Sequence, residues 1–442
     1  MASAETHALM RQHARDIFAH VLRETTVETA FTRHVQASRG VLRVGDDLYS
    51  LDNASRIFAV AFGKAAHVMA RALREQLGAT LSGIVSTPGN SEPQVEGFRY
   101  FTGGHPLPNR ESEKAAEAIL KSLRALDENA LVLYLISGGG SAMVEKPIDD
   151  EISLDDLSET HRVLVGSGAK IAEMNAIRKH LSAVKGGRMA QAVKAGVKQV
   201  SIVVSDVPDD ALDALASGPT MPDRSSVEEC YAIAERYGMV EKFPASVREL
   251  FEKKCLAETP DADDPLFHYS RWWPILSNQD AVKAAARKAS ELGFAVEIDN
   301  TCDEWEYTRA ADYLLGRLRK LRGGASRVCL ISGGEVSVPL PEKTGTGGRN
   351  QQFALYCASR ITSENLTVLS AGTDGIDGNS PAAGALADGT TTLRHSALGT
   401  GTSVDKALQA FDAHSFFTAL GDDVTTGPTG TNVRDVRVLL AY

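Results

Sequence analysis

The chain has 442 residues, which is long for one domain, and its 43% hydrophobic and 24% charged residues are ordinary for a folded globular protein. This composition excludes a disordered, a fibrous and a membrane-embedded chain. The net charge of -10 argues against a general nucleic-acid binder, because proteins of that class need a basic surface. A few cations gathered in one cleft can still bind a small anion.

The cysteines are five in number and scattered, and none forms a C-x-x-C pair. This pattern indicates reduced thiols in a cytoplasmic protein rather than a disulfide framework or a zinc site. The first residues lack the apolar core of a signal peptide, and the chain contains no run of about 18 apolar residues. We therefore expect a cytoplasmic protein with no membrane span.

The predicted elements begin with a helix over residues 5–38, where apolar residues recur at helical spacing. Short apolar strands then alternate with helices, the strands at 57–62, 83–86, 131–136 and 200–204 and the helices at 64–77, 111–126 and within 154–195. Residues 244–274 carry several prolines and an acidic run, which predicts a linker or a loop-rich boundary. The alternation then resumes, with helices at 280–292, 308–322 and 351–360 and strands at 294–298, 328–331 and 366–370.

This alternation predicts an α/β protein of two domains, residues 1–243 and 275–442, each a largely parallel sheet flanked by helices. Ligands of such sheets bind beyond the carboxyl ends of the strands. The loops that follow the strands are therefore the candidate functional segments.

A glycine-rich loop follows the buried strand at 131–136. Its glycines let the backbone approach a ligand closely and turn N–H groups toward an anion such as phosphate or carboxylate. The alternative is a tight turn with no ligand, since the loop matches neither the Walker A pattern nor G-x-G-x-x-G. The loop consists of Ser137, Gly138, Gly139, Gly140 and Ser141.

Two cations stand where helices are expected to begin. Lys64 follows the first apolar strand, and Arg349 comes after Gly347 and Gly348 and before Asn350. The helix dipole disfavours a cation at this end, so its presence indicates an anionic ligand such as phosphate. The alternatives are a solvent-facing lysine and a flexible surface loop.

Acidic residues follow two other strands, and a basic helix lies between them. Asp206 and Asp374 suit Mg²⁺ shared with substrate phosphates, because that ion needs only one or two protein carboxylates. Capping or turn formation is the alternative for each. Arg178 and Lys185 fall on one face of a basic helical segment, which either flanks an anion site or is a solvated face.

Nine short stretches carry a resemblance that spans nearly the whole chain: 62–65, 104–109, 135–142, 175–182 with 185–188, 205–207, 216–220, 347–351, 371–378 and 426–433. In content and order they resemble the glycerate 2-kinase family, whose C-terminal portion is called the MOFRL domain. Residue 352 is Gln352 where the family often has glutamate, and residue 381 is Pro381 where it often has aspartate. Any metal or ribose contact made by those acids must be made otherwise in this chain.

The resemblance implies ATP-dependent phosphorylation of D-glycerate to 2-phosphoglycerate. It also implies a Rossmann-like domain over 1–243, a domain with the MOFRL region over 275–442, and an active site in the cleft between them. Lys64 and Arg349 correspond to the family's essential cations.

From the residues and the resemblance together we expect Lys64 and Arg349 to neutralise the transferring phosphoryl group. Asp206 would orient or deprotonate the hydroxyl, and Asp206 and Asp374 would hold Mg²⁺. The remaining candidates would bind substrate or phosphate: the loop 137–141, Arg178, Lys185, Gly347, Gly348 and Asn350.

Two other functions are alternatives to the kinase. One is an NAD(P)H-dependent hydroxypyruvate reductase, a name that some members of the family carry, and the missing dinucleotide fingerprint argues against it. The other is a nonenzymatic anion-binding protein, which the density of polar loops disfavours. We expect D-glycerate and ATP as partners and no nucleic acid or membrane, while a homodimer stays open.

Overall fold

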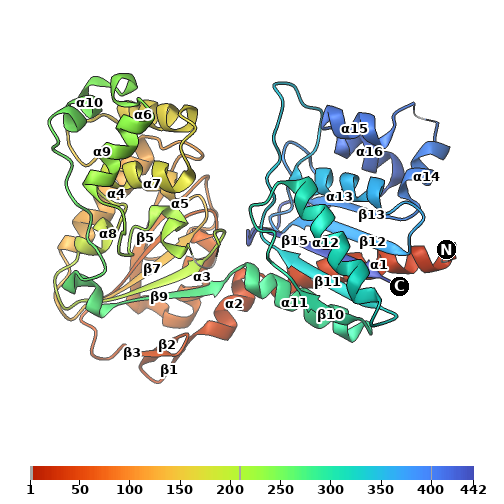
Figure 1. Cartoon of the computed structure of the whole chain (residues 1–442). Coiled ribbons are helices and arrows are strands. Elements are labelled where there is room, and N and C mark those ends of the chain that lie inside the picture. The colour runs from red at the N-terminus through yellow and green to blue at the C-terminus, as the bar shows by residue number, and fades with distance from the viewer. Residues whose placement is uncertain (1–2, 209–210, 400) are drawn as a thin grey trace. The chain divides into compact units, whose positions relative to one another are not determined.

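The computed structural model describes residues 3–208, 211–399 and 401–442 (Figure 1). The chain forms two compact units. The first consists of Met1–Thr26 with Leu276–Tyr442, and the second of Val27–Ile275. The α/β class predicted from the sequence is confirmed.

The second unit is built on a six-stranded sheet in the order β6-β5-β4-β7-β8-β9. The pairings from β6 through β8 are parallel, and β4 and β7 are buried along their whole length, which explains their uninterrupted apolar sequences. The strands are β4 (Ile57–Phe62), β5 (Leu81–Thr87), β6 (Phe98–Thr102), β7 (Leu131–Ser137), β8 (Lys198–Val204) and β9 (Ser270–Leu276).

Helices cover this sheet because their apolar residues fall on one face. In α4 (Arg110–Arg124) the buried residues recur every three or four positions, and the Asn109 side chain caps the start by accepting the Ser112 N–H. The other helices of this unit are α2 (Val27–His34), α3 (Ala66–Leu77), α5 (Gly140–Met143), α6 (Leu154–Gly166), α7 (Ile171–His180), α8 (Arg188–Gln191), α9 (Val227–Arg236) and α10 (Ala245–Glu252).

The single helix predicted over residues 5–38 is wrong. Helix α1 (Ala4–Glu24) ends before Thr25 and Thr26, whose β-branched side chains disfavour helix, and α2 begins at Val27. The chain then forms a small antiparallel sheet whose first turn, Arg39-Gly40, has positive φ at both residues, as a tight hairpin requires. Its strands are β1 (Val35–Ser38), β2 (Val41–Val44) and β3 (Asp47–Ser50).

The first unit has a six-stranded sheet in the order β10-β11-β15-β12-β13-β14. Only β10 and β11 pair in parallel, so the prediction of a largely parallel sheet is correct for the second unit and wrong for this one. The reasons are β15, which enters antiparallel between β11 and β12, and β13, which pairs antiparallel with β12 and β14. The strands are β10 (Ala295–Ile298), β11 (Val328–Gly333), β12 (Leu366–Gly372), β13 (Gly384–Asp388), β14 (Asp423–Val424) and β15 (Asp435–Ala441).

Helix α1 belongs to this first unit, although it lies at the other end of the sequence. His7 is 2.7 Å from the Tyr442 hydroxyl, and Arg11 forms an ion pair with the buried Asp388. The remaining helices are α11 (Asn278–Glu291), α12 (Tyr307–Arg322), α13 (Arg349–Arg360), α14 (Thr391–Ala397), α15 (Val404–Ala410) and α16 (Ala413–Leu420). Among the helices that the structure describes, none is long and apolar enough to cross a membrane.

The units differ from the predicted domain boundaries in two places. Residues 244–274, expected to be a linker, supply helix α10 and most of the edge strand β9 to the second unit. Residues 1–26 belong with the C-terminal segment rather than with the rest of 1–243. The short elements α10 and β9 bury apolar side chains, which a scan for prolines and acids does not detect. The helical spacing of residues 1–26 predicts a helix but not the sheet against which that helix packs.

A buried ion pair lies inside the second unit. The side chains of Lys185 and Glu145 are each only 1% exposed, and the Lys185 ammonium contacts the Glu145 carboxylate. The Ser182 hydroxyl and the Lys146 N–H donate to the same carboxylate, at 2.6 and 3.1 Å. Both charges are therefore satisfied inside the protein.

We predict that Lys185→Met destabilises this unit, because it leaves Glu145 as an unpaired buried charge. The expected cost is about 3–5 kcal/mol, seen as a lower midpoint of thermal unfolding by calorimetry. Adding Glu145→Gln should restore much of the loss, since the amide carries no charge. Lys114→Met, which removes a surface pair with Glu111, is the control and should change the midpoint little. A Lys185→Met protein as stable as the parent would contradict this account.

Candidate functional site

The loops of the second unit gather at the carboxyl ends of its parallel strands. Lys64 follows β4, and its backbone N–H donates to the Gly138 carbonyl at 2.9 Å. The next N–H, of Ala65, donates to the Ser137 hydroxyl at 3.0 Å. These bonds fix the start of α3 against the loop 137–141 that follows β7, while the Lys64 side chain stays exposed.

Asp206, which follows β8, lies against the same loop. A Cβ atom built on Gly138 would be 1.9 Å from Asp206 Oδ2, so only glycine lets the carboxylate approach this closely. Gly139 has a φ of 80° and lies beside the His105 ring. Lower hydration of that ring, together with the Lys64 ammonium, lowers the pKa of His105 and keeps it neutral at neutral pH.

Arg178 of α7 reaches the far end of this loop. Its guanidinium donates to the Ser141 hydroxyl at 3.1 Å and to the Asn175 side chain at 3.3 Å, and Ser141 lies 3.0 Å from the Ser217 hydroxyl. The Arg178 Nε is buried with no hydrogen-bond partner, and none of the ion pairs among the described residues includes Arg178. This cation therefore faces only neutral groups.

The His161 ring, which lies near Arg178, is uncharged. Burial, followed by the charge of Arg178, lowers the pKa of His161 to about 4, so its imidazole is neutral at neutral pH. A half-buried guanidinium with neutral neighbours is suited to an anionic ligand, because no protein carboxylate competes for it.

Lys185, which was expected near this site, serves the interior instead, and so does the neighbouring Arg188. Lys185 pairs with Glu145, as described above. Arg188 donates to four backbone carbonyls, those of Lys179, Ser182, Ala257 and Glu258. The structure thus brings Lys64, Arg178, Asp206 and the loop 137–141 together and leaves Lys185 and Arg188 out.

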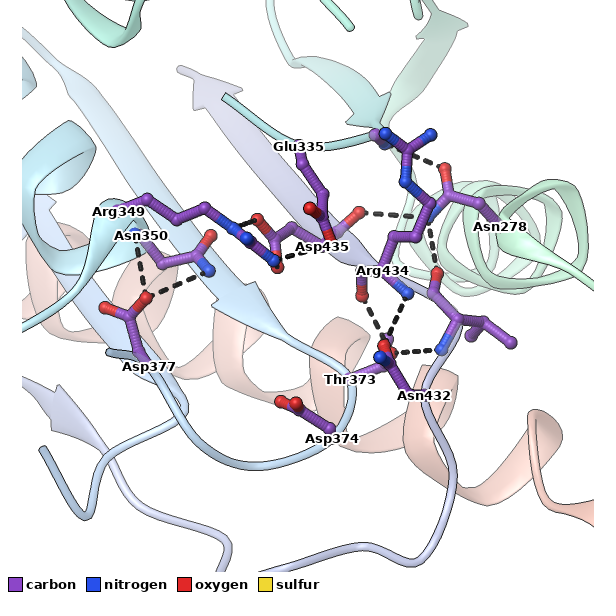
Figure 2. A network of polar contacts seen from close by, with 12 residues as sticks. Asn278, Glu335, Arg349, Asn350, Thr373, Asp374, Asp377, Asn432, Arg434 and Asp435 are labelled. Atoms are coloured by element: carbon purple, nitrogen blue, oxygen red, sulfur yellow. Dashed lines mark hydrogen bonds and ion pairs between the residues drawn. The ribbon is translucent and has the colours of Figure 1, made fainter. Parts of the chain in front are cut away.

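A second candidate site lies in the first unit, where β11 and β12 end and β15 begins (Figure 2). Arg349, the first residue of α13, forms a bidentate pair with Asp435, with Nε–Oδ2 at 2.6 Å and Nη2–Oδ1 at 3.1 Å. It also pairs with Glu335 at 2.7 Å. Burial lowers the pKa of Arg349, but the charges of Asp435 and Glu335 have the larger combined effect, so the pKa is raised.

The start of α13 is capped by Asp377. Its carboxylate accepts the Asn350 backbone N–H at 3.0 Å and the Asn350 side-chain amide at 3.3 Å (Figure 2). It also accepts the Gln351 backbone N–H at 2.9 Å and the Gln351 side-chain amide at 3.1 Å. Burial raises the pKa of Asp377 to about 6, against the effect of these hydrogen bonds. The N–H groups expected to meet a phosphate at this helix start are thus already satisfied at Asn350 and Gln351.

The glycine loop before α13 is tightly held. The Gly347 N–H donates to the Asn379 side chain at 2.8 Å, and the Thr346 N–H donates to Asp412 at 3.1 Å. A Cβ on Gly348 would come within 2.3 Å of the Asp377 carboxylate. Hydrogen bonds therefore hold this loop in place, and at Gly348 there is no room for a side chain.

This loop borders a cavity of about 700 Å³. Arg349 and Asp374 line it, and Asp374 also accepts the Ile376 N–H at 3.1 Å within its own turn. The sequence reasoning missed Glu335, Asp435 and the aromatic side chain of the cavity, Phe411. A strand prediction over 435–441 would have placed Asp435 at this edge of the sheet.

No group of three His, Cys, Asp or Glu side chains within the described residues is placed to hold a metal ion. Mg²⁺ bound through substrate phosphates needs only one or two carboxylates, and half-buried Asp206 and Asp374 fit that requirement.

Comparison with known proteins identifies the family. Residues 13–252 match a domain described as of unknown function (DUF4147), and residues 328–435 match the MOFRL family. A D-glycerate 2-kinase of Thermotoga maritima is 37% identical over 87% of this chain and 90% of its own length. A crystal structure of glycerate kinase from the same organism superposes with a TM-score of 0.85 at 33% identity, covering 98% of this chain and all of that one.

A protein of Agrobacterium vitis, provisionally named a hydroxypyruvate reductase, is 35% identical over 87% of both chains. The family matches cover more than half of the chain, and the identity extends over most of its length. The two units and their strand-end loops are therefore those of a known family, and this chain belongs to the glycerate 2-kinases.

Proposed function

We propose that the protein transfers the γ-phosphoryl group of ATP to the 2-hydroxyl of D-glycerate, giving 2-phosphoglycerate and ADP. The observation that carries the proposal is the pair Lys64 and Arg178. In a chain of this family, both cations flank one glycine loop, and neither forms an ion pair with a carboxylate of the described residues. Such a site is built to receive an anion from outside.

Arg178 and Ser141 are suited to the carboxylate of glycerate. The guanidinium can offer paired N–H donors, and its Nε has no hydrogen-bond partner among the described residues. Ser141 is already aligned by Arg178 and Ser217, so its hydroxyl is oriented before the substrate arrives.

Lys64 and Asp206 are suited to the reacting end of the substrate. Lys64 supplies a mobile positive charge for the phosphoryl group, and Asp206 would orient the 2-hydroxyl or accept its proton. The two groups lie against neighbouring parts of one loop, so a bound hydroxy acid can meet both.

Arg349 would contribute from the first unit, where 38% of its side chain remains exposed and it lines the cavity. Because Asp435 and Glu335 already pair with it, phosphate binding there would have to share its charge. Asp206 and Asp374 would hold Mg²⁺, which neutralises phosphate charge when it is bound. We place the protein in the cytoplasm on its five unpaired cysteines, and a homodimer stays a prediction.

The first test identifies the phosphorylated product and measures the effect of replacing Lys64. Incubation of the purified protein with D-glycerate, ATP and Mg²⁺ should yield 2-phosphoglycerate, read by phosphorus NMR. Lys64→Ala should lower kcat/KM by about 10²–10³, because a charge aimed at the transition state is lost. Lys198→Ala alters an exposed lysine at the opposite end of β8 and serves as the control. NADH oxidation with hydroxypyruvate and no phosphorylated product would refute the proposal.

The second test concerns Arg349, for which alanine is a poor probe because it would leave the buried Asp435 unpaired. Arg349→Lys keeps the charge but loses the bidentate geometry, and we expect kcat to fall about tenfold or more. In the double variant Arg349→Met with Asp435→Asn, thermal stability should be largely retained while phosphoryl transfer stays low. Recovery of full activity in that double variant would exclude a role for Arg349.

The third test addresses Arg178. Arg178→Lys should raise the KM for D-glycerate about tenfold and leave the KM for ATP within about twofold, because a lysine cannot replace the paired donors to a carboxylate. Arg162→Lys, in the exposed pair with Glu159 on α6, is the matched control. Equal effects on both KM values would mean that Arg178 does not select the carboxylate.

A further inference from the structure

We propose that the cavity of the first unit binds the aromatic base of the nucleotide, with Phe411 as the side chain on which the base stacks. The inference rests on the proposed function, since it concerns the co-substrate of that reaction. It assigns the nucleotide base to the residues between β11 and α16.

The cavity has the size and the wall of a small-molecule site. Its volume of about 700 Å³ lies within the usual range for such ligands. Val336, Val338 and Leu340 line it from the segment after β11, and Ile376 lines it from the loop after β12. Leu340 and Ile376 are 69% and 48% exposed, which leaves apolar surface for a planar ligand to cover.

Phe411 occupies a backbone position that glycine would suit better. It follows α15 with φ of 50° and ψ of 42°, the left-handed conformation in which helices commonly end on glycine. Helix α16 ends in this way, at Gly421. A bulky residue in this conformation is strained, and its side chain lines the cavity. A stacking function for the ring would explain why a side chain is present there.

Several hydrogen bonds fix the backbone on both sides of Phe411 before any ligand binds. Gln352, on the cavity wall, donates to the Leu408 carbonyl of α15 at 3.0 Å. The Gly345 N–H donates to the Ala410 carbonyl at 2.9 Å, and the neighbouring Asp412 accepts the Thr346 N–H. The glycine loop and the end of α15 therefore form one preformed wall, which lowers the entropy cost of binding.

The charges around the cavity favour a neutral ring over glycerate. Asp374 and Asp377 line it, and Glu335 lies at Arg349 beside them, so a free carboxylate would meet net repulsion. An aromatic base carries no charge and gains from the apolar side chains. Arg349 lines the same cavity, so the phosphates of a nucleotide whose base lies on Phe411 could be directed toward its guanidinium.

The test uses Phe411→Gly in the full chain. Glycine accepts the left-handed backbone, so the thermal midpoint should hold or rise. The KM for ATP should increase about tenfold or more, because base–aromatic stacking is lost. The KM for D-glycerate should change less than twofold, and inhibition by tripolyphosphate, which has no base, should be unchanged. Phe411→Trp should keep the KM for ATP near that of the parent.

Leu393→Ala, which alters another exposed apolar side chain of the same unit outside the cavity, is the control. An unchanged KM for ATP in folded Phe411→Gly would overturn the inference while leaving the kinase proposal intact. Calorimetric titration of the parent and Phe411→Gly with ADP separates the two ideas further. If the parent binds ADP through Phe411 but forms no phosphoglycerate, the kinase proposal fails and the base site stands.

Discussion

The ion pair between Arg349 and Asp435 joins the start of α13 to the start of β15, and the geometry of the first unit depends on it. Asp435 is also held through its backbone, because the Asn278 side chain donates to its carbonyl at 3.0 Å. The same Asn278 accepts the Gly334 N–H at 2.9 Å, which fixes the end of β11. One helix start and two strand ends thus meet at a fixed point, and the cavity is formed beside it.

The two candidate sites differ in how much positive charge they leave available for an anionic ligand. In the second unit, Arg178 faces neutral hydroxyl and amide groups, so its charge remains available to a ligand. In the first unit, Arg349 is already neutralised by two carboxylates, and a phosphate there gains less from it. The net charge of -10 is therefore compatible with anion binding, because only some of the cations are used inside the protein.

The sequence predicts where several strands end, but it does not predict which side chains pair with the charged residues that follow them. Apolar runs such as 57–62 and 131–136 are distinctive, because strands buried on both faces leave no alternation to misread. The sequence did not predict the strand over 435–441, and for that reason it did not predict the antiparallel pairings that this strand makes. A cation at the start of a helix is disfavoured by the helix dipole and therefore predicts an anionic ligand from outside the protein. For Arg349 the structure supplies the anions internally, from Asp435 and Glu335, and spacing along the chain cannot reveal such a partner.

Lys185 shows the same limit from the opposite direction. Its place in a basic run suggests a surface, but the run is folded so that the ammonium meets Glu145, forty positions away in the chain. Phe411 was invisible for a related reason, since its meaning lies in a positive φ rather than in its neighbours in sequence. Residues whose charge is cancelled or whose backbone is strained become interpretable only in the fold. In this chain, an arginine left without a carboxylate and a phenylalanine kept where glycine would be easier both point to ligands that are not part of the protein.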